Sequence, residues 1–263
     1  MKNVIVIPAT IPKEKNLSTK FGGWEWMEIS IKAWTYWCEK NDVELVIYDK
    51  PQRDDLMKYR ITLQRWFDVH DLLDEKNIEW DNVALIDACS VPKWDCPNFF
   101  ELTDNKFCVG REKDNLKWVY ESVQGYKEFF DNYELNIADY FCTQFVIHNK
   151  SHKKLIKDWG NFFLDNIDEL NTVQKRVDRG TDQTPINYFM QMNNVEMSFL
   201  PIEYRVSHLH RKNFLQYNWQ LDEDKTPFYI KYGKIWFFSG FDKTVRNKLM
   251  VSAWKSIGKM YER

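Results

Sequence analysis

Residues 82–87 have the sequence NVALID, a short and continuous hydrophobic run that ends in a carboxylate. Such a run is typical of a strand that is buried on both faces of a sheet. Two similar runs come earlier, at 3–9 and 43–48, and apolar residues recur at helical spacing in the segments between the runs, at 27–41 and 56–76. The order strand, helix, strand, helix, strand predicts a parallel sheet with helices packed against it.

Asp87 stands at the place where such a sheet is expected to bind a ligand. Ligands of open α/β sheets lie outside the carboxyl ends of the strands, and Asp87 directly follows a predicted strand. The rest of the chain continues the mixed pattern, since strand-like runs occur at 107–110 and 140–148 and helical patterns at 152–166, 182–192 and 242–261. We therefore expect a functional site at the edge of the sheet that carries Asp87.

The composition is that of a folded protein with nearly balanced charge. The 263 residues include 37 basic and 39 acidic side chains, and 44% are hydrophobic. The net charge of −2 gives no general attraction for nucleic acid, so DNA is disfavoured as a partner. No window approaches the ~18 consecutive apolar residues of a membrane span, and we expect no membrane span and a cytoplasmic protein. A chain of this length predicts one compact unit.

Five short motifs follow one another in an order that carries a family resemblance. They are QRWF (64–67), NVALIDACS (82–90), YFCTQFVI (140–147), GTDQTPIN (180–187) and FFSGFDK (237–243). The set resembles nucleotide-sugar glycosyltransferases with the GT-A fold, in particular family 8 and related viral and bacterial enzymes. The resemblance implies an α/β fold of the GT-A, Rossmann-like type, with a mixed and mostly parallel sheet flanked by helices. For a viral protein, the expected location is the host cytoplasm.

The resemblance also implies a single GT-A-like domain that spans residues 1–263, with two halves that bind different substrates. Residues 1–110, approximately, would form the half that binds the nucleotide sugar. Residues 111–263, approximately, would form the half that binds the acceptor, including a closing C-terminal helix.

The resemblance assigns a donor site and a catalytic pair. Asp182 and Gln183 would lie beside the reacting sugar and are the expected catalytic residues. The expected donor-binding residues are Ala9, Thr10, Arg65, Asp87, Cys89, Gly240 and Lys243. Within this set, the alanine and threonine would contact the nucleoside, the arginine and aspartate would border the diphosphate and ribose, and the glycine and lysine would close over the phosphates.

The metal site of the family is altered in this sequence. In the family, two carboxylates of a D-x-D motif and the histidine of H-F-x-G bind manganese or magnesium. Here Cys89 replaces the second carboxylate and Phe237 replaces the histidine, so Asp87 alone is retained. Hard divalent ions prefer oxygen ligands, which makes a cysteine a poor replacement and a phenylalanine none. No cofactor is therefore assigned, and Mn²⁺ or Mg²⁺ would meet an incomplete ligand set.

Three accounts of this change stay open at the level of sequence. Lys243 and Arg246 could balance the diphosphate charge, which would give a metal-independent transferase. Alternatively, His208 and His210 could join Asp87 and restore a metal site. The third account is a catalytically inactive protein that still binds a glycan or a nucleotide sugar.

The function predicted from these motifs is transfer of a hexosyl or pentosyl group from a nucleotide-diphosphate sugar to a glycan or another hydroxyl acceptor. An alternative is a DNA-modifying glycosyltransferase that acts on a hydroxymethylated base. A plainer alternative is a doubly wound α/β protein in which Asp87 caps a loop, and in which Asp182 and Gln183 favour the start of a helix.

Overall fold

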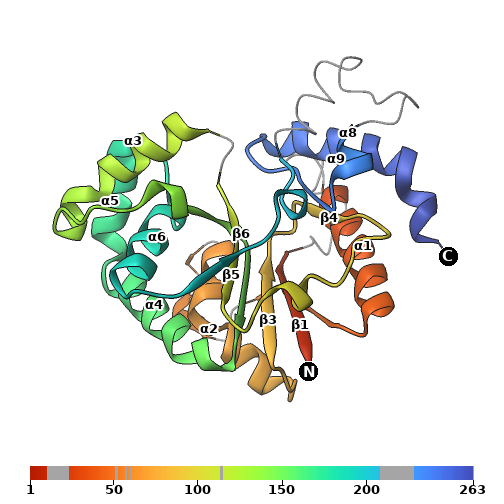
Figure 1. Cartoon of the computed structure of the whole chain (residues 1–263), viewed down its shortest axis with the longest axis horizontal. Coiled ribbons are helices and arrows are strands. Elements are labelled where there is room, and N and C mark those ends of the chain that lie inside the picture. The colour runs from red at the N-terminus through yellow and green to blue at the C-terminus, as the bar shows by residue number, and fades with distance from the viewer. Residues whose placement is uncertain are drawn as a thin grey trace.

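A six-stranded sheet forms the centre of the molecule (Figure 1). The structure is a computed structural model that describes residues 1–10, 24–50, 53–56, 58–59, 61–112, 115–207 and 228–262. Along the sheet the strand order is β2-β1-β3-β6-β5-β7. The strands are β1 (Asn3–Pro8), β2 (Glu44–Tyr48), β3 (Asn82–Ile86), β5 (Phe107–Arg111), β6 (Phe141–Asn149) and β7 (Met197–Phe199).

The sheet is mixed because one strand runs against the others. β1 pairs in parallel with both β2 and β3, and β5 pairs in parallel with β7. β6 is antiparallel to both of its neighbours, β3 and β5. The other five strands therefore point the same way, and their carboxyl ends lie at one edge of the sheet. The predicted mixed and mostly parallel α/β sheet is confirmed.

Helices cover both faces of the sheet. In Figure 1, α2 to α6 lie on one side of the strands, and α1, α8 and α9 lie on the other side. Their bounds are α1 (Glu25–Asn41), α2 (Ile61–Glu75), α3 (Leu116–Tyr126), α4 (Lys153–Asp165), α5 (Ile167–Val177), α6 (Gln183–Met192), α8 (Phe228–Tyr232) and α9 (Lys243–Ile257). Among the described residues, no helix is long and apolar enough to cross a membrane.

The alternation of side chains along β1 shows why the sheet must be covered twice. Val4 and Val6 belong to the core that contains Trp66 of α2, whereas Ile5 packs into a separate core with Trp34 of α1. Successive side chains of a strand point to opposite faces. A strand that is apolar on both faces from Val4 to Pro8 therefore requires apolar helices on both sides, as the hydrophobic run at 3–9 predicts.

A short second sheet links the C-terminal part of the chain to the turn after β3. It consists of β4 (Ser90–Pro92) and β8 (Ile235–Phe237), which run antiparallel, with Ser90 opposite Phe237. The sequence pattern does not predict these two strands, because three residues are too few to show a periodicity. The Phe238 N–H donates to the Cys89 carbonyl at 2.7 Å, which places the start of the loop that leads into α9 beside the turn after β3.

A buried pair of histidines joins α2 to β6 and gives a prediction about stability. The Nε2 atoms of His70 and His148 are 2.9 Å apart, and the His70 ring is stacked on Trp80. Burial lowers the pKa of His70 to about 4, helped by the charge of Lys153, and burial also holds the pKa of His148 well below its usual value. Both rings are therefore neutral in the folded protein at neutral pH.

Acid is expected to destabilise the fold through this pair. Because the pKa of His70 is lower in the folded chain than the value of about 6.5 expected on unfolding, the unfolded chain binds more protons as the pH falls from about 6.5 towards 4. From His70 alone, we expect the free energy of unfolding to be about 2 kcal/mol lower at pH 5 than at pH 7. Urea unfolding at the two pH values measures this difference. The variant His70→Phe should lose that part of the pH dependence, and an unchanged dependence would contradict the assignment.

Candidate functional site

Asp87 lies at the carboxyl end of β3 in a turn that is fixed by hydrogen bonds. Its backbone N–H donates to the carbonyl of Gln144 at 3.0 Å, which extends the pairing of β3 with β6 by one residue. The Ser90 hydroxyl donates to the Asp87 carbonyl at 2.6 Å and accepts from the Trp34 indole at 3.0 Å. The Asp87 side chain is 18% exposed, so the carboxylate reaches the surface at the edge where a ligand is expected.

Arg65 is the buried partner of Asp87. Its side chain is 2% exposed, Nη1 forms an ion pair with Oδ1 of Asp87, and Nη2 donates to the carbonyl of Thr143 at 2.9 Å. Its Nε is buried and has no hydrogen-bond partner among the described residues. A guanidinium taken out of water needs such partners, since an uncompensated buried charge is costly. Asp87 and the Thr143 carbonyl, near the start of β6, therefore hold Arg65 in place from two sides.

Asp182 joins the same cluster from the other half of the chain. It is the N-cap residue of α6, yet its side chain makes no cap hydrogen bond. Instead, Oδ2 accepts a hydrogen bond from the Trp66 indole at 3.0 Å. N-cap aspartates usually bond to the first backbone N–H groups of their own helix. The orientation of Asp182 across to α2 therefore serves the cluster rather than the helix end.

The charge of Asp182 is shaped by its neighbours. Burial raises the pKa of Asp182 above its usual value, and the nearby charge of Asp87 raises it further. Arg65 and the Trp66 indole act in the opposite direction and lower the pKa. The indole that bonds to Asp182 belongs to Trp66, which directly follows Arg65, and Arg65 is paired with Asp87. The structure therefore brings these three predicted site residues together. A carboxyl with a raised pKa beside a permanent cation is suited to proton transfer or to stabilising positive charge.

The loop before α6 needs a glycine at one position. Gly180 has φ 78°, in the left-handed region, and a Cβ atom there would lie 2.3 Å from the Ser122 hydroxyl and 2.4 Å from that of Thr184. Only a residue without a Cβ fits this path. The path leads into Gln183, whose Nε2 is buried without a hydrogen-bond partner among the described residues. Such an unmade bond costs about 1–3 kcal/mol and leaves a donor available for a ligand.

Asn187 ties α6 to the strand that carries Thr143. Its Oδ1 accepts from the Phe141 N–H at 2.8 Å, and its Nδ2 donates to the Phe141 carbonyl at 2.9 Å and to the Gln183 carbonyl at 2.7 Å. Asn187 is fully buried, so these bonds are shielded from water. The asparagine thereby fixes the position of the Asp182–Gln183 turn relative to the start of β6.

Ala9 and Thr10 lie at the same edge of the sheet, after β1. Ala9 is buried and its N–H donates to the Tyr48 carbonyl at the end of β2, at 3.0 Å. Thr10 is exposed, and its hydroxyl donates to the Asp49 carbonyl at 3.4 Å. Both residues precede a segment that the structure does not describe. Their place beside the end of β3 is the one predicted for residues that contact a nucleoside, and that contact stays a prediction.

The described residues do not fit a manganese or magnesium ion. Cys89 is buried, and burial raises the pKa of its thiol to about 12, so it is a neutral thiol near neutral pH. Phe237 is fully buried in β8, and Asp87 is engaged by Arg65. Within the described part of the chain, no group of three histidine, cysteine or acidic residues is placed to hold a metal ion. Hard cations require several oxygen ligands, which this set lacks.

The predicted metal ligands His208 and His210 lie outside the described residues. Their prediction as ligands therefore stays untested.

The loop between β8 and α9 carries the last of the predicted donor-binding residues. Gly240 has φ 71°, and Asp242 caps α9 by accepting from the N–H groups of Thr244 and Val245 at 2.9 and 3.0 Å. Lys243 is exposed in the first turn of α9. The cation turned back towards the sheet is Arg246, one turn further on, whose charge lowers the pKa of the Cys89 thiol against the effect of burial.

A hollow of about 370 Å³ opens at the same edge of the sheet, beyond the ends of β5 and β7. Its polar walls are Arg111 and Arg205, and its apolar wall is formed by Phe199 and the three residues that follow it. The Arg111 guanidinium lies 3.6 Å from the centroid of the Phe199 ring and pairs with Asp139. Because β5 and β7 run in the same direction as β3, this hollow and Asp87 share one edge.

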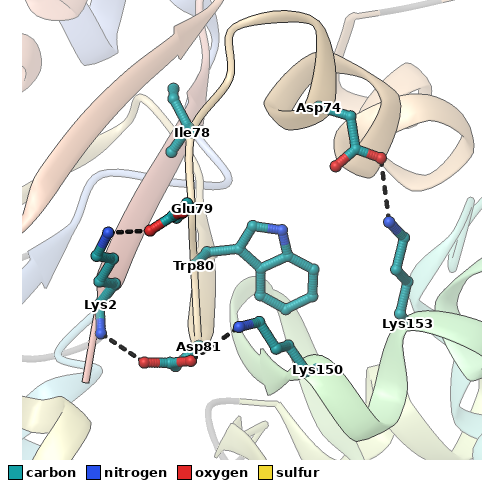
Figure 2. Close-up of a pocket in the computed structure, with 8 residues that line it drawn as sticks. All are labelled: Lys2, Asp74, Ile78, Glu79, Trp80, Asp81, Lys150 and Lys153. Carbon is teal, nitrogen blue, oxygen red and sulfur yellow. Dashed lines mark hydrogen bonds and ion pairs between the residues drawn. The ribbon is translucent and has the colours of Figure 1, made fainter.

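A second hollow, of about 680 Å³, lies at the opposite edge, around the start of β1 and β3 (Figure 2). Figure 2 shows that its charged side chains are already paired with one another. The pairs are Lys2 with Glu79, Lys150 with Asp81, and Lys153 with Asp74, and the backbone N–H of Lys2 also donates to Asp81. We assign no ligand to this hollow, because its charged side chains pair with one another and because it lies at the edge opposite Asp87.

Sequence reasoning missed two members of the cluster. Trp66 was a landmark of the QRWF motif and of the predicted helix, but its hydrogen bond to Asp182 spans 116 residues. Thr143 takes part through its backbone carbonyl, which any residue could supply. The sequence signal that could have identified the tryptophan as a member of the cluster is its position directly after Arg65 in the motif.

No family model matches the sequence, and no curated protein matches it. Among solved structures, a glycosyltransferase involved in the glycosylation of the major capsid of PBCV-1 is similar, with a TM-score of 0.59 and 7% identity over 96% of this chain and 100% of that chain.

Two further similar structures are more distant in shape. Mouse xyloside xylosyltransferase 1 has a TM-score of 0.47 and 9% identity over 90% of this chain and 96% of its own. The galactosyltransferase LgtC in complex with donor and acceptor sugar analogs has a TM-score of 0.43 and 10% identity, with coverage of 96% and 99%.

The first of these likenesses extends over nearly the whole chain and defines its fold class. The chain has the Rossmann-like α/β fold of GT-A type glycosyltransferases, as the five motifs predict. At 7% identity the likeness concerns the fold alone, and the activity is argued from the site.

Proposed function

We propose that the chain is a glycosyltransferase that transfers a sugar from a nucleotide-diphosphate donor to a hydroxyl group of a glycan. The observation that carries the proposal is the convergence of Asp87, Arg65 and Asp182, from three distant segments, at the carboxyl edge of the sheet. Ligands of this type of sheet bind at that edge. The unusual orientation of Asp182, away from its own helix, supports a chemical role for its carboxyl.

In the proposed reaction, the bond between the anomeric carbon and the phosphate oxygen breaks, and its electron pair leaves with the nucleotide. The acceptor oxygen bonds to the anomeric carbon, and its proton passes to the phosphate oxygen of the departing nucleoside diphosphate. Positive charge develops at the anomeric carbon during this exchange, and the negative side chains of Asp87 and Asp182 would stabilise it. Gln183 would donate a hydrogen bond to the donor sugar through its unpartnered Nε2.

We also propose that the two substrates enter from different halves of the chain. Residues 1–110, approximately, would bind the donor, since they supply Ala9, Thr10 and Asp87. Residues 111–263, approximately, would bind the acceptor within the same domain. The hollow beside Arg111 supports this division, because it lies at the edge that bears Asp87 and combines an apolar wall with charged groups.

Slow hydrolysis of the correct donor is the first expected result. Many transferases pass the sugar to water when no acceptor is present, so incubation with a panel of nucleotide-diphosphate sugars should release sugar from one of them. Release is measured by chromatography of the nucleotide product. The control is the same panel with protein that has been unfolded by heat. A protein that binds no donor and releases no sugar would contradict the proposal.

A binding protein without turnover is the second candidate. It is favoured by the replacement of two expected metal ligands by Cys89 and Phe237. The same panel separates the two functions, because a binding protein would retain one nucleotide sugar in equilibrium dialysis and release no sugar from it.

A further inference from the structure

Arg246 is held in a defined orientation at the start of α9. Its Nε donates to the Phe238 carbonyl at 2.9 Å, and its Nη2 donates to the Phe241 carbonyl at 3.1 Å. The guanidinium lies 5.0 Å from the ring of Trp26, which is a cation–π contact. Its Nη1 has no hydrogen-bond partner among the described residues. Two carbonyls and an aromatic ring thus position the cation, and one donor edge stays available.

The orientation of Arg246 places its charge beside the turn that follows β3. The Phe238 N–H donates to the Cys89 carbonyl at 2.7 Å, so the residue that holds Arg246 is bonded to the residue two positions after Asp87. β8 and β4 continue this contact, with Phe237 opposite Ser90. Cys89 and Phe237 are the two positions at which the family resemblance expects metal ligands. Arg246 therefore lies where the ligands of a divalent ion are missing.

A diphosphate group needs concentrated positive charge, and a guanidinium can supply it. Arginine binds phosphate oxygens with two parallel N–H groups and keeps its charge at any physiological pH. Lys243 lies three residues before Arg246 on the same helix, and residues at this spacing share one face. The exposed ammonium of Lys243 and the held guanidinium of Arg246 would therefore act on the same ligand.

We propose that Arg246, with Lys243, takes the place of the divalent cation, so that the chain binds the diphosphate of its donor without a metal ion. The inference rests on the proposed function, since it concerns the donor of that reaction. It differs from a metal site in its chemistry: the positive charge belongs to the polypeptide and is not removed by a chelator. Arg65 does not serve this role, because its side chain is 2% exposed and engaged by Asp87.

The test is equilibrium binding of nucleoside diphosphates, measured by isothermal titration calorimetry. Uridine, guanosine, adenosine and thymidine diphosphates are titrated into the whole chain, once with EDTA and once with Mn²⁺. We expect one of them to bind with the same dissociation constant, within about twofold, in both buffers. Arg246→Gln should weaken that binding by roughly 10- to 100-fold, the value of a charged hydrogen bond. Arg246→Lys, which keeps the charge but loses the paired N–H groups, should have an intermediate affinity.

The control variant is Lys255→Gln, which removes the same charge from the exposed last turn of the same helix. It should bind within about twofold of the original chain. Binding that appears only with Mn²⁺ would overturn the inference and leave the proposed function intact. Unchanged binding by a folded Arg246→Gln would also overturn it. Failure of all four nucleotides in both buffers would overturn the proposed function itself. The comparison of the two buffers requires no variant and tests the metal independence by itself, and Arg246→Lys tests the role of the arginine if Arg246→Gln does not fold.

Discussion

Replacing Asp182 with asparagine should lower the rate of sugar transfer by about 100-fold or more, the usual effect of removing a group that transfers a proton or stabilises charge. The change keeps the shape of the side chain and removes its negative charge. Oδ1 of the new asparagine can still accept the hydrogen bond from the Trp66 indole. The fold is therefore expected to survive, and the loss should appear in kcat rather than in donor binding.

Steady-state kinetics with the donor identified by the panel measures this effect. The matched control is Asp168→Asn, which removes an exposed carboxylate from the first turn of α5 and should leave the rate within about twofold. A second variant, Trp66→Phe, removes the indole N–H that helps to keep Asp182 ionised, so it should raise the pKa of Asp182 and shift the pH–rate profile upward. An Asp182→Asn enzyme with full activity would show that the reacting sugar lies elsewhere.

Replacing Arg65 with methionine should destabilise the fold by about 3–5 kcal/mol, the cost of breaking a buried ion pair by removing one partner. Methionine preserves much of the volume but leaves Asp87 without its cation and the Thr143 carbonyl without its donor. Urea unfolding at about pH 7 measures the loss.

Two comparisons test the physical reason for that loss. The double variant Arg65→Met with Asp87→Leu removes both charges and should recover a large part of the stability. Arg53→Met removes one member of an exposed ion pair with Asp55 and should cost about 0–1 kcal/mol. A single variant at Arg65 that lost less than about 1 kcal/mol would contradict the burial argument.

The elements that position the site could be predicted from local sequence patterns. The run at 83–86 is hydrophobic at every position because β3 is buried on both faces, and it places Asp87 without any knowledge of the rest of the chain. The helical pattern at 182–192, with Pro185 in the predicted first turn, likewise predicts that Asp182 stands at the start of a helix. Long, strongly patterned segments give such information, because their burial depends on one simple geometric rule.

The contacts that make the cluster could not be predicted in this way. The hydrogen bond from Trp66 to Asp182 and the ion pair from Arg65 to Asp87 join segments 116 and 22 residues apart. No local sequence pattern predicts these two contacts, because both depend on the order in which β3 and β6 lie in the sheet. The sequence offers Lys243 and Arg246 together as cations of α9, but it does not show how the arginine is held. The orientation of Arg246 depends on carbonyls in a loop that only the fold brings near.

Asn187 has a consequence for the way in which substrates can enter. The Asn187 amide bonds to both the N–H and the carbonyl of Phe141, as a residue of a neighbouring strand would do. These bonds hold the turn that carries Asp182 to the central sheet, and the turn could move away from the sheet only by breaking them. The facing side, which carries α9, is joined to the turn after β3 by the pairing of β4 with β8 and also packs against α1, so a bulky donor meets an edge that is anchored on both sides.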